Sequence, residues 1–320
     1  MSMFSRREFG RTVLAGVPVV AALGSIQLGA SAKISVGVST DSYRDLPRVV
    51  GRDNVDDVIR ALQAARVTGT EVAFSNFEPA PAPTAPFMAG SAAYPQRVVL
   101  TPEQILSMNT GARLALRAWR IQTTAAFFET VRGKLSAAGL AVHAGALAYD
   151  DSFTDDEIDA TFRHAKMLGV ATVSSPMTMA IAKRVIPFAE RHRVAVAIHN
   201  QVDGNTGAAI ATSDLDAALA LSSCVTLKFD IGNVTASGRD TVAVLRRYLP
   251  RVSHVLVKDR LRNGGASQYF GEGDTPIAGV LNVLKASPGP IPVFIEYDYV
   301  GLRPPADEVA ACVAYVSGRT

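Results

Sequence analysis

The chain has 320 residues, of which 48% are hydrophobic and 19% are charged. This length suffices for one large or two ordinary domains, and the apolar content is enough for a packed core, which excludes a disordered chain. The 32 basic and 29 acidic residues form no basic patch or aromatic-interleaved basic run, so we expect no nucleic-acid partner. Cys224 and Cys312 are too few and too far apart for a disulfide framework or a zinc motif.

Residues 1–32 have the features of a twin-arginine export signal. Arg6 and Arg7 precede an uncharged stretch over residues 12–24, and residues 30–32 read Ala-Ser-Ala, a small-residue cleavage site. The alternative is a membrane anchor, but the apolar run is shorter than the ~20 residues of a spanning helix and contains Gly16 and Pro18. We therefore expect export by the twin-arginine machinery, cleavage near Lys33, a periplasmic location and no stable membrane insertion. Removing three arginines and one glutamate leaves 29 basic and 28 acidic residues.

From residue 34 onwards, short β-branched or alternating runs are followed by segments of helical periodicity. The expected strands are 34–38, 70–74, 140–146, 170–174, 194–199, 225–230, 252–258 and 292–297. The expected helices are 54–67, 103–138 with a break, 154–168, 178–192, 213–222, 238–249, 275–286 and 305–317. Eight such units predict an α/β protein with a single (β/α)8 TIM-barrel domain over residues 33–320. A doubly wound open sheet ranks second, because no glycine-rich phosphate loop follows the first strand.

One long irregular segment, residues 75–102, follows the second expected strand and is rich in proline and alanine. Loops of this length inside a compact domain are often functional. We expect a lid or wall over the active site, and a surface insertion is the alternative.

Polar residues lie on or directly after five of the expected strands. They are Glu71, His199, Gln201, Asp230, Lys258, Asp259 and Glu296. A barrel places its active site at the carboxyl ends of its strands. His199, Asp230 and Glu296 combine nitrogen and oxygen donors that suit a divalent cation such as Mn²⁺, Mg²⁺ or Zn²⁺. Such an ion stabilises an enediolate; Lys258 would hold the same oxygen, and Glu296 or Asp230 would act as the base. The alternative for Lys258 and Asp259 is a salt-bridged pair at the rim.

A resemblance to a known family rests on six blocks in a fixed order. They read FTDDEIDATFRHAKMLGVATVSS, VAVAIHNQ, KFDIGNVTA, VLVKDR, FGEGDTPIAGVL and IPVFIEYDY. Together they resemble the sugar phosphate isomerase/epimerase family of xylose isomerase-like barrels, especially its exported members, over nearly the whole chain after residue 32. The resemblance implies a barrel with a divalent metal at its mouth, held by His199, Asp230 and Glu296, and a sugar or keto-sugar substrate.

Three positions depart from the pattern of that family. Where relatives commonly read H-N-H, D-I-G-H and H-x-K-D, this chain has Gln201, Asn233 and Leu256 in place of a histidine. His254 points to the same side of its strand as Leu256, but two residues along a strand displace it by roughly 6–7 Å toward the barrel floor. We therefore expect Leu256 to pack the upper layer of the barrel, and the metal site to be weakened or abandoned.

Two functions of different classes follow. The first is a periplasmic enzyme that isomerises or epimerises a sugar or keto-sugar by removing a proton next to a carbonyl, with Glu296, Lys258 and His199 as catalytic residues. Its candidate substrate-binding residues are Gln201, Asn233, Glu71, Asp259 and His254. The second is a metal-free carbohydrate-binding or accessory protein on the same barrel, favoured by the loss of three histidines. A nuclease fits poorly, because the near-neutral chain lacks a basic face.

Overall fold

The computed structural model describes residues 34–80, 102–204 and 209–320, and these form a closed barrel of eight parallel strands in the order β1 to β8. The strands are β1 Val36–Ser39, β2 Gly69–Ala73, β3 Ala141–Ala146, β4 Thr172–Ser175, β5 Ala195–His199, β6 Val225–Asp230, β7 Val252–Val257 and β8 Val293–Ile295. The ring closes where β1 pairs with β8, with Val38 opposite Ile295. The predicted (β/α)8 barrel is thereby confirmed, and the alternative of an open sheet is wrong.

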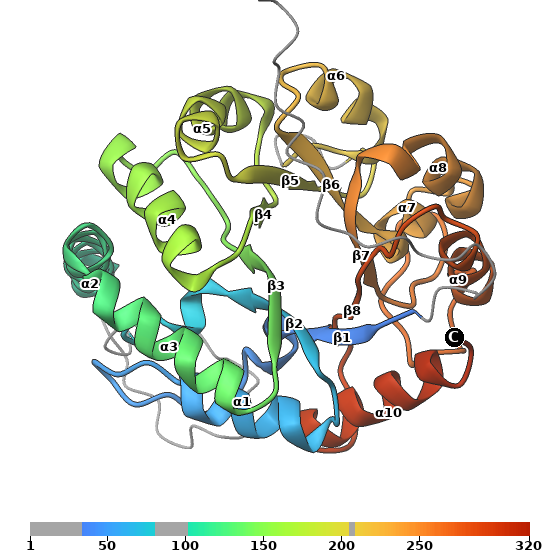
Figure 1. Cartoon of the computed structure of the whole chain (residues 1–320), viewed down its shortest axis with the longest axis horizontal. Helices are drawn as coiled ribbons and strands as arrows, with labels where there is room; N and C mark the ends of the chain where they lie inside the picture. The colour runs from blue at the N-terminus through green and yellow to red at the C-terminus, as the bar shows by residue number, and fades with distance from the viewer. Residues whose placement is uncertain (1–33, 81–101, 205–208) are drawn as a thin grey trace, which may run out of the picture. The chain divides into compact units, whose positions relative to one another are not determined.

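Helices surround the strands on the outside of the ring (Figure 1). They are α1 Val55–Ala64, α2 Pro102–Gln122, α3 Ala125–Ala137, α4 Asp155–Leu168, α5 Met179–His192, α6 Leu215–Leu219, α7 Ile231–Ala236, α8 Thr241–Tyr248, α9 Ile277–Lys285 and α10 Pro305–Ser317. Short 3-10 turns η1 to η4 cover Thr40–Tyr43, Phe74–Asn76, Thr212–Asp214 and Leu249–Arg251. Among the described residues, no helix combines the length and the apolar character needed to cross a membrane.

Local sequence explains why helix α4 begins and ends where it does. The Thr154 side chain accepts a hydrogen bond from the backbone N–H of Glu157, and the Glu157 carboxylate accepts one from the backbone N–H of Thr154, which forms a capping box. Gly169 ends the helix with a φ of 79°, a left-handed conformation that glycine adopts without strain. Buried apolar residues such as Ile158 and Phe162 pack the helix against the barrel.

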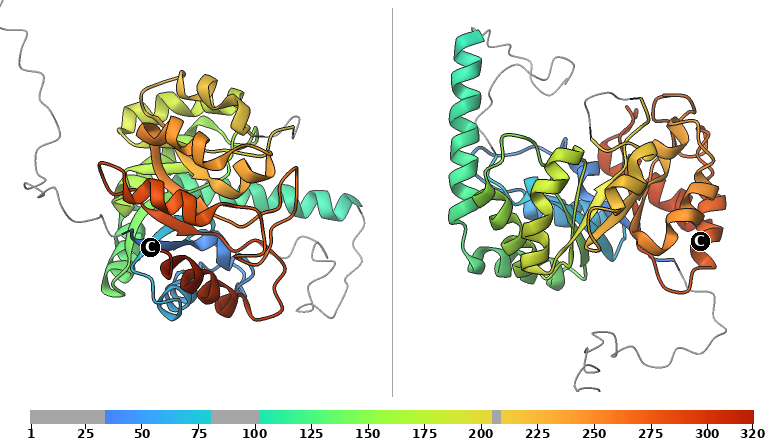
Figure 2. Two further views of the ribbon diagram at one scale, coloured as in Figure 1. Left: turned by 90° about the vertical axis from the view of Figure 1, so that its right-hand side faces the viewer. Right: turned by 90° about the horizontal axis from the view of Figure 1, so that it is seen from above.

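Helix α2 runs along the outside of the helix ring and extends beyond it (Figure 2). Its later turns are tied to α4 by three arginines: Arg113, Arg117 and Arg120 all lie within 3.3 Å of the Glu157 carboxylate. The predicted break between residues 103 and 138 is confirmed, because α3 begins only at Ala125.

One helix was not predicted, and two expectations fall wholly or partly outside the described residues. Helix α7 follows β6 directly and was not predicted, because all six of its residues are buried and its sequence lacks an amphipathic pattern. Of the predicted lid over 75–102, residues 75–80 contain the end of η2 and a bridge between Val50 and Ala80, and residues 81–101 lie outside the described part of the chain. The predicted export signal, residues 1–32, also lies outside it.

A polar cluster lies inside the barrel, on strands β2, β4, β6 and β7. Glu71 Oε2 accepts a hydrogen bond from Lys228 Nζ at 2.6 Å, and Glu71 Oε1 lies 2.5 Å from Ser174 Oγ and 3.0 Å from His254 Nε2. We call Glu71, Lys228, His254 and Ser174 the floor cluster. All four are buried. Burial would raise the pKa of Glu71, but the Lys228 ammonium and the His254 ring outweigh it and hold that pKa well below its usual range.

We predict that Lys228→Met lowers the free energy of unfolding by about 3–5 kcal/mol, because it leaves the buried Glu71 carboxylate without its cation. The double variant Glu71→Gln/Lys228→Met removes both charges and should recover most of that loss. Urea unfolding at neutral pH measures both values. Lys134→Met is the matched control, because Lys134 pairs with Asp56 on the exposed surface and should change stability by less than about 1 kcal/mol. Equal effects of Lys228→Met and Lys134→Met would contradict the prediction.

Candidate active site

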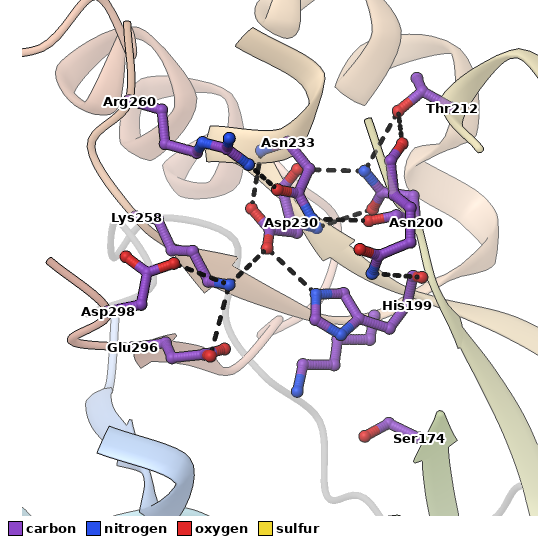
Figure 3. Close-up of polar contacts among 12 residues, drawn as sticks. Ser174, His199, Asn200, Thr212, Asp230, Asn233, Lys258, Arg260, Glu296 and Asp298 are labelled. Atoms are coloured by element: carbon purple, nitrogen blue, oxygen red, sulfur yellow. Dashed lines mark hydrogen bonds and ion pairs between the residues drawn. The ribbon is translucent and has the colours of Figure 1, made fainter. Parts of the chain in front are cut away.

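Lys258 lies at the centre of a charged cluster at the carboxyl ends of β5 to β8 (Figure 3). Its ammonium nitrogen Nζ lies 3.3 Å from Asp230 Oδ2, 3.3 Å from Glu296 Oε1 and 3.2 Å from Asp298 Oδ2. The ring nitrogen Nε2 of His199 lies 3.0 Å from the same Asp230 oxygen. We call Lys258, Asp230, Glu296, Asp298 and His199 the mouth cluster.

Strand geometry places these side chains together. His199 and Asp230 are the last residues of β5 and β6, and Lys258 and Glu296 follow β7 and β8 by one residue. Because the strands are parallel, their carboxyl ends meet at one end of the barrel. The predicted catalytic residues Glu296, Lys258 and His199 are therefore brought into one cluster.

Charge balance fixes the protonation states at the centre of the mouth cluster. Burial would raise the pKa of Asp230, but the Lys258 ammonium and the His199 ring outweigh it and lower that pKa. Burial likewise opposes the low pKa of Glu296, which Lys258 and Lys228 hold below its usual range. Burial would lower the pKa of Lys258, and the surrounding carboxylates of Glu296, Asp230 and Asp298 raise it instead. At neutral pH an ammonium ion therefore lies between ionised carboxylates.

His199 is a neutral ring in this arrangement. Burial and the nearby Lys228 charge lower the pKa of His199, although Asp230 opposes the shift. An ionised carboxylate only accepts hydrogen bonds, so the proton of the neutral ring is assigned to Nε2, which donates to Asp230. The other ring nitrogen, Nδ1, then carries a lone pair that can accept a hydrogen bond from a ligand hydroxyl.

Two buried asparagines hold Asp230 in place. The Asn200 side chain accepts a hydrogen bond from the backbone N–H of Asp230 at 2.8 Å and donates to the Asp230 carbonyl at 3.2 Å. The backbone N–H of Asn233 donates to Asp230 Oδ1 at 2.9 Å. The Asn233 side chain donates to the Asn200 carbonyl and accepts from Arg260. The side chain of Asn233 was predicted to bind substrate, but it is occupied by hydrogen bonds to Asn200 and Arg260.

The other predicted substrate-binding residues lie in different places. Glu71 and His254 belong to the floor cluster, below the mouth. The Asp259 carboxylate accepts hydrogen bonds from the backbone N–H groups of residues 271, 273 and 275, so it organises the loop that precedes α9. The Gln201 side chain donates to the carbonyl of His199, beside the mouth cluster.

Asp41 and Asp298 are acidic residues of the site that the sequence analysis did not select. Asp41 lies in η1, directly after β1, and the Ser42 hydroxyl next to it accepts from the Tyr297 N–H and donates to the Ile295 carbonyl, on either side of Glu296. Burial, and then the nearby Glu296 carboxylate, raise the pKa of Asp41 to about 6. Strand alternation would have indicated Asp298, which is two residues beyond Glu296 and therefore on the same face.

Leu256 lies where a family histidine is expected. It is fully buried and pairs in register with Asp230 of β6 on one side and Phe294 of β8 on the other. His254 contacts the ring of Phe294, with ring centroids 5.7 Å apart, and binds Glu71 rather than any residue of the mouth cluster. No imidazole of β7 therefore reaches the mouth.

The donor set at the mouth does not fit a divalent metal in this arrangement. Both oxygens of Asp230 are already hydrogen-bonded, Glu296 Oε1 binds Lys258, and the Nε2 proton of His199 is directed at Asp230. A dication about 4 Å from the Lys258 ammonium would be repelled by several kcal/mol at an effective dielectric of about 20. Over the described ranges of the chain, no three His, Cys, Asp or Glu side chains converge to hold an ion.

Comparison with known proteins shows what this architecture is similar to. No protein-family model and no curated protein sequence matches the chain. Among solved structures, the chain is similar to a xylose isomerase domain protein from Planctomyces limnophilus, with a TM-score of 0.55 and 14% identity over 90% of this chain and 96% of that one.

Two further structures match over similar lengths. A sugar phosphate isomerase/epimerase from Parabacteroides distasonis gives a TM-score of 0.55 and 15% identity, covering 94% of this chain and 98% of that one. The 3-keto-D-glucoside 4-epimerase of E. coli gives a TM-score of 0.56 and 12% identity, covering 88% of this chain and 99% of that one. The resemblance inferred from the sequence is confirmed at the level of the fold: this chain has the (β/α)8 barrel of the xylose isomerase-like, sugar phosphate isomerase/epimerase proteins.

Proposed function

We propose that this protein isomerises or epimerises a sugar or keto-sugar by moving a proton next to a carbonyl. The proposal rests on the different surroundings of the two carboxylate oxygens of Glu296. Its Oε1 atom is held by Lys258, whereas Oε2 is buried and has no hydrogen-bond partner within the described part of the structure. Buried polar atoms are normally paired, so an unpaired carboxylate oxygen at the mouth of a barrel is a candidate for the atom that accepts the substrate proton.

The first step of the reaction needs only groups that the mouth cluster supplies. The Glu296 carboxylate takes the proton from the carbon next to the carbonyl, the C–H electron pair forms a carbon–carbon double bond, and the carbonyl π pair moves to its oxygen. The Lys258 ammonium donates hydrogen bonds to this oxyanion. Return of a proton to the same carbon from the other face gives the epimer. Return to the former carbonyl carbon gives the isomer, with the neighbouring hydroxyl losing its proton to become the new carbonyl and the former carbonyl oxygen gaining one, so no oxidant or other reactant is consumed.

Asp41 is the proposed second acid of the site. It lies close enough to Glu296 for the two carboxylates to affect each other, and their environments move the two pKa values apart: that of Asp41 rises to about 6 and that of Glu296 falls. Such a separation assigns one carboxyl group as acid and the other as base. Asp41 would then deliver a proton to the intermediate that Glu296 creates.

The chemical class of the substrate is supported by the structures with the same barrel. One of them is a 3-keto-D-glucoside 4-epimerase, which acts on an oxidised sugar. In this chain the neutral His199 ring and the side chain of Asp298, which is 22% exposed, are placed to bind hydroxyl groups at the mouth. We assign a small sugar or keto-sugar as the substrate.

The competing function is a carbohydrate-binding protein without catalysis, and it is favoured by Leu256, Gln201 and Asn233 in place of family histidines. A binding protein would hold the sugar without exchanging its hydrogens. Incorporation of solvent deuterium therefore distinguishes the two functions.

We predict that the protein exchanges a hydrogen next to the carbonyl of a sugar or keto-sugar with D2O, and that Glu296→Gln slows this exchange by about 10²–10⁴-fold, because the amide cannot accept the proton. Mass spectrometry and NMR of a panel of sugars measure the exchange. Glu272→Gln, at an exposed loop position, is the control and should leave the rate unchanged. Exchange that survives Glu296→Gln would exclude Glu296 as the base, and sugar binding without exchange would support the binding protein.

We predict that Asp41→Asn raises the free energy of unfolding at pH 7 by about 2–3 kcal/mol and leaves it unchanged near pH 3. The folded state binds a proton at Asp41 with a pKa of about 6, above the unfolded value of 3.8, so folding stability falls as the pH rises between these values. Urea unfolding across this pH range checks the sign. Asp45→Asn, at an exposed site one turn away, is the control; an Asp41 effect no larger than that of Asp45 would contradict the raised pKa.

We also propose that the chain is exported through the twin-arginine machinery and works in the periplasm, on the strength of Arg6, Arg7 and the Ala-Ser-Ala sequence at 30–32. Replacing both arginines by lysine should abolish appearance of the processed protein in the periplasmic fraction. The N-terminus of the wild-type protein, read by mass spectrometry, should lie near Lys33. Periplasmic protein of normal amount from the double-lysine variant would exclude this route.

A further inference from the structure

We propose that the Lys258 ammonium ion takes the place of the divalent metal in this barrel, so that the site binds no metal and its chemistry runs without one. The inference concerns the site of the proposed function and rests on it for the reaction. Its consequences for metal binding are measurable without any substrate.

Lys258 is surrounded by acidic partners. An ammonium group has three N–H donors, and three carboxylates surround this one at 3.2–3.3 Å. Two of them, Asp230 and Glu296, are the acids that the family resemblance assigns to the metal. The lysine side chain is only 9% exposed, so its charge is held inside the cluster rather than in solvent.

Leu256 lies next to the expected position of the ion. Leu256 pairs in register with Asp230 and stands two residues before Lys258 on the same strand face. A leucine offers no ligand atom, and it is fully buried, so no solvent-borne ligand replaces one there. The position expected for the metal ion therefore lies beside the Lys258 side chain and next to the hydrocarbon side chain of Leu256.

The acids of this site require a nearby positive charge. Asp230 and Glu296 are buried acids, and buried carboxylates remain ionised only when a positive charge is close. Lys258 supplies that charge from within the cluster, with its ammonium nitrogen 3.3 Å from an oxygen of each acid. A metal would have to displace this covalently tethered cation before it could reach the same oxygens.

The ammonium group of Lys258 can also act on a substrate. Asp298 is the most exposed of its three partners, with 22% of the side chain accessible, against 0% for Asp230 and 11% for Glu296. The hydrogen bond to Asp298 is therefore the one that a substrate oxygen can replace. Lys258 would keep Asp230 and Glu296 in position while donating its third N–H to the oxyanion.

The test compares Mn²⁺ binding by the wild type, Lys258→Met and Leu256→His/Lys258→Met, by elemental analysis after dialysis and by thermal unfolding. In about 1 mM Mn²⁺ the wild type should retain no ion and show no rise in melting temperature. The double variant should retain about one equivalent and melt at least about 5 °C higher with the ion than without it. Lys183→Met, at an exposed position of α5, is the control and should behave like the wild type.

Lys258→Met keeps the test decisive if the double variant does not fold. Removing the ammonium leaves Asp230 and Glu296 without their cation, so Mn²⁺ should raise the melting temperature of this single variant as well. About one equivalent of tightly held Mn²⁺ in the wild type would overturn the inference, and so would folded variants that gain no affinity for the ion.

The reaction gives a separate readout. Wild-type protein treated with a chelator should exchange substrate hydrogens with D2O at its full rate, and loss of exchange that Mn²⁺ restores would overturn the inference. Absence of exchange with every sugar, before and after chelation, would instead count against the proposed function, and the metal-binding comparison would still decide the role of Lys258.

Discussion

The structure of the mouth depends on one electrostatic constraint: carboxylates that the barrel buries need a cation within it. Lys258 meets this constraint for Asp230, Glu296 and Asp298 with a single ammonium group. The remaining contacts follow from its position. Asn200 binds the Asp230 backbone and the Asn233 N–H binds the Asp230 carboxylate. His199 stays neutral because burial, and then the nearby positive charge, lower its pKa.

The same constraint is met a second time, deeper in the barrel. Glu71 is buried with Lys228, His254 and Ser174 around it, and Lys228 also contributes to the low pKa of Glu296 above. On β7, Leu256 stands between His254 of the floor cluster and Lys258 of the mouth cluster, and it pairs in register with Phe294 of β8. Leu256 and Phe294 are both buried apolar residues. A leucine at position 256 therefore adds a buried hydrocarbon side chain instead of a ligand for the mouth.

Much of the fold followed from the sequence, because strand and helix periodicities differ and eight repeats of both leave few architectures. Helix α7 was missed because its six residues are buried on all sides. At the site, residues at strand ends were predictable from the barrel rule, and Lys258, Asp230, Glu296 and His199 do meet there. The partners of Lys258 were not predictable, because a long side chain can reach several acidic residues and only the closed barrel determines which of them lie close to it. Asn233 and Asp259 were selected as ligands for substrate, and their side chains are occupied by backbone groups and by Arg260.

The position of the Lys258 ammonium in crystals of the protein grown with Mn²⁺ tests the central claim most directly. Anomalous diffraction near the manganese absorption edge would locate any ion independently of the lysine side chain. The account predicts no anomalous peak at the mouth, and Lys258 Nζ between Asp230 and Glu296. A manganese peak bound by Asp230 and Glu296, with Lys258 turned away, would contradict it.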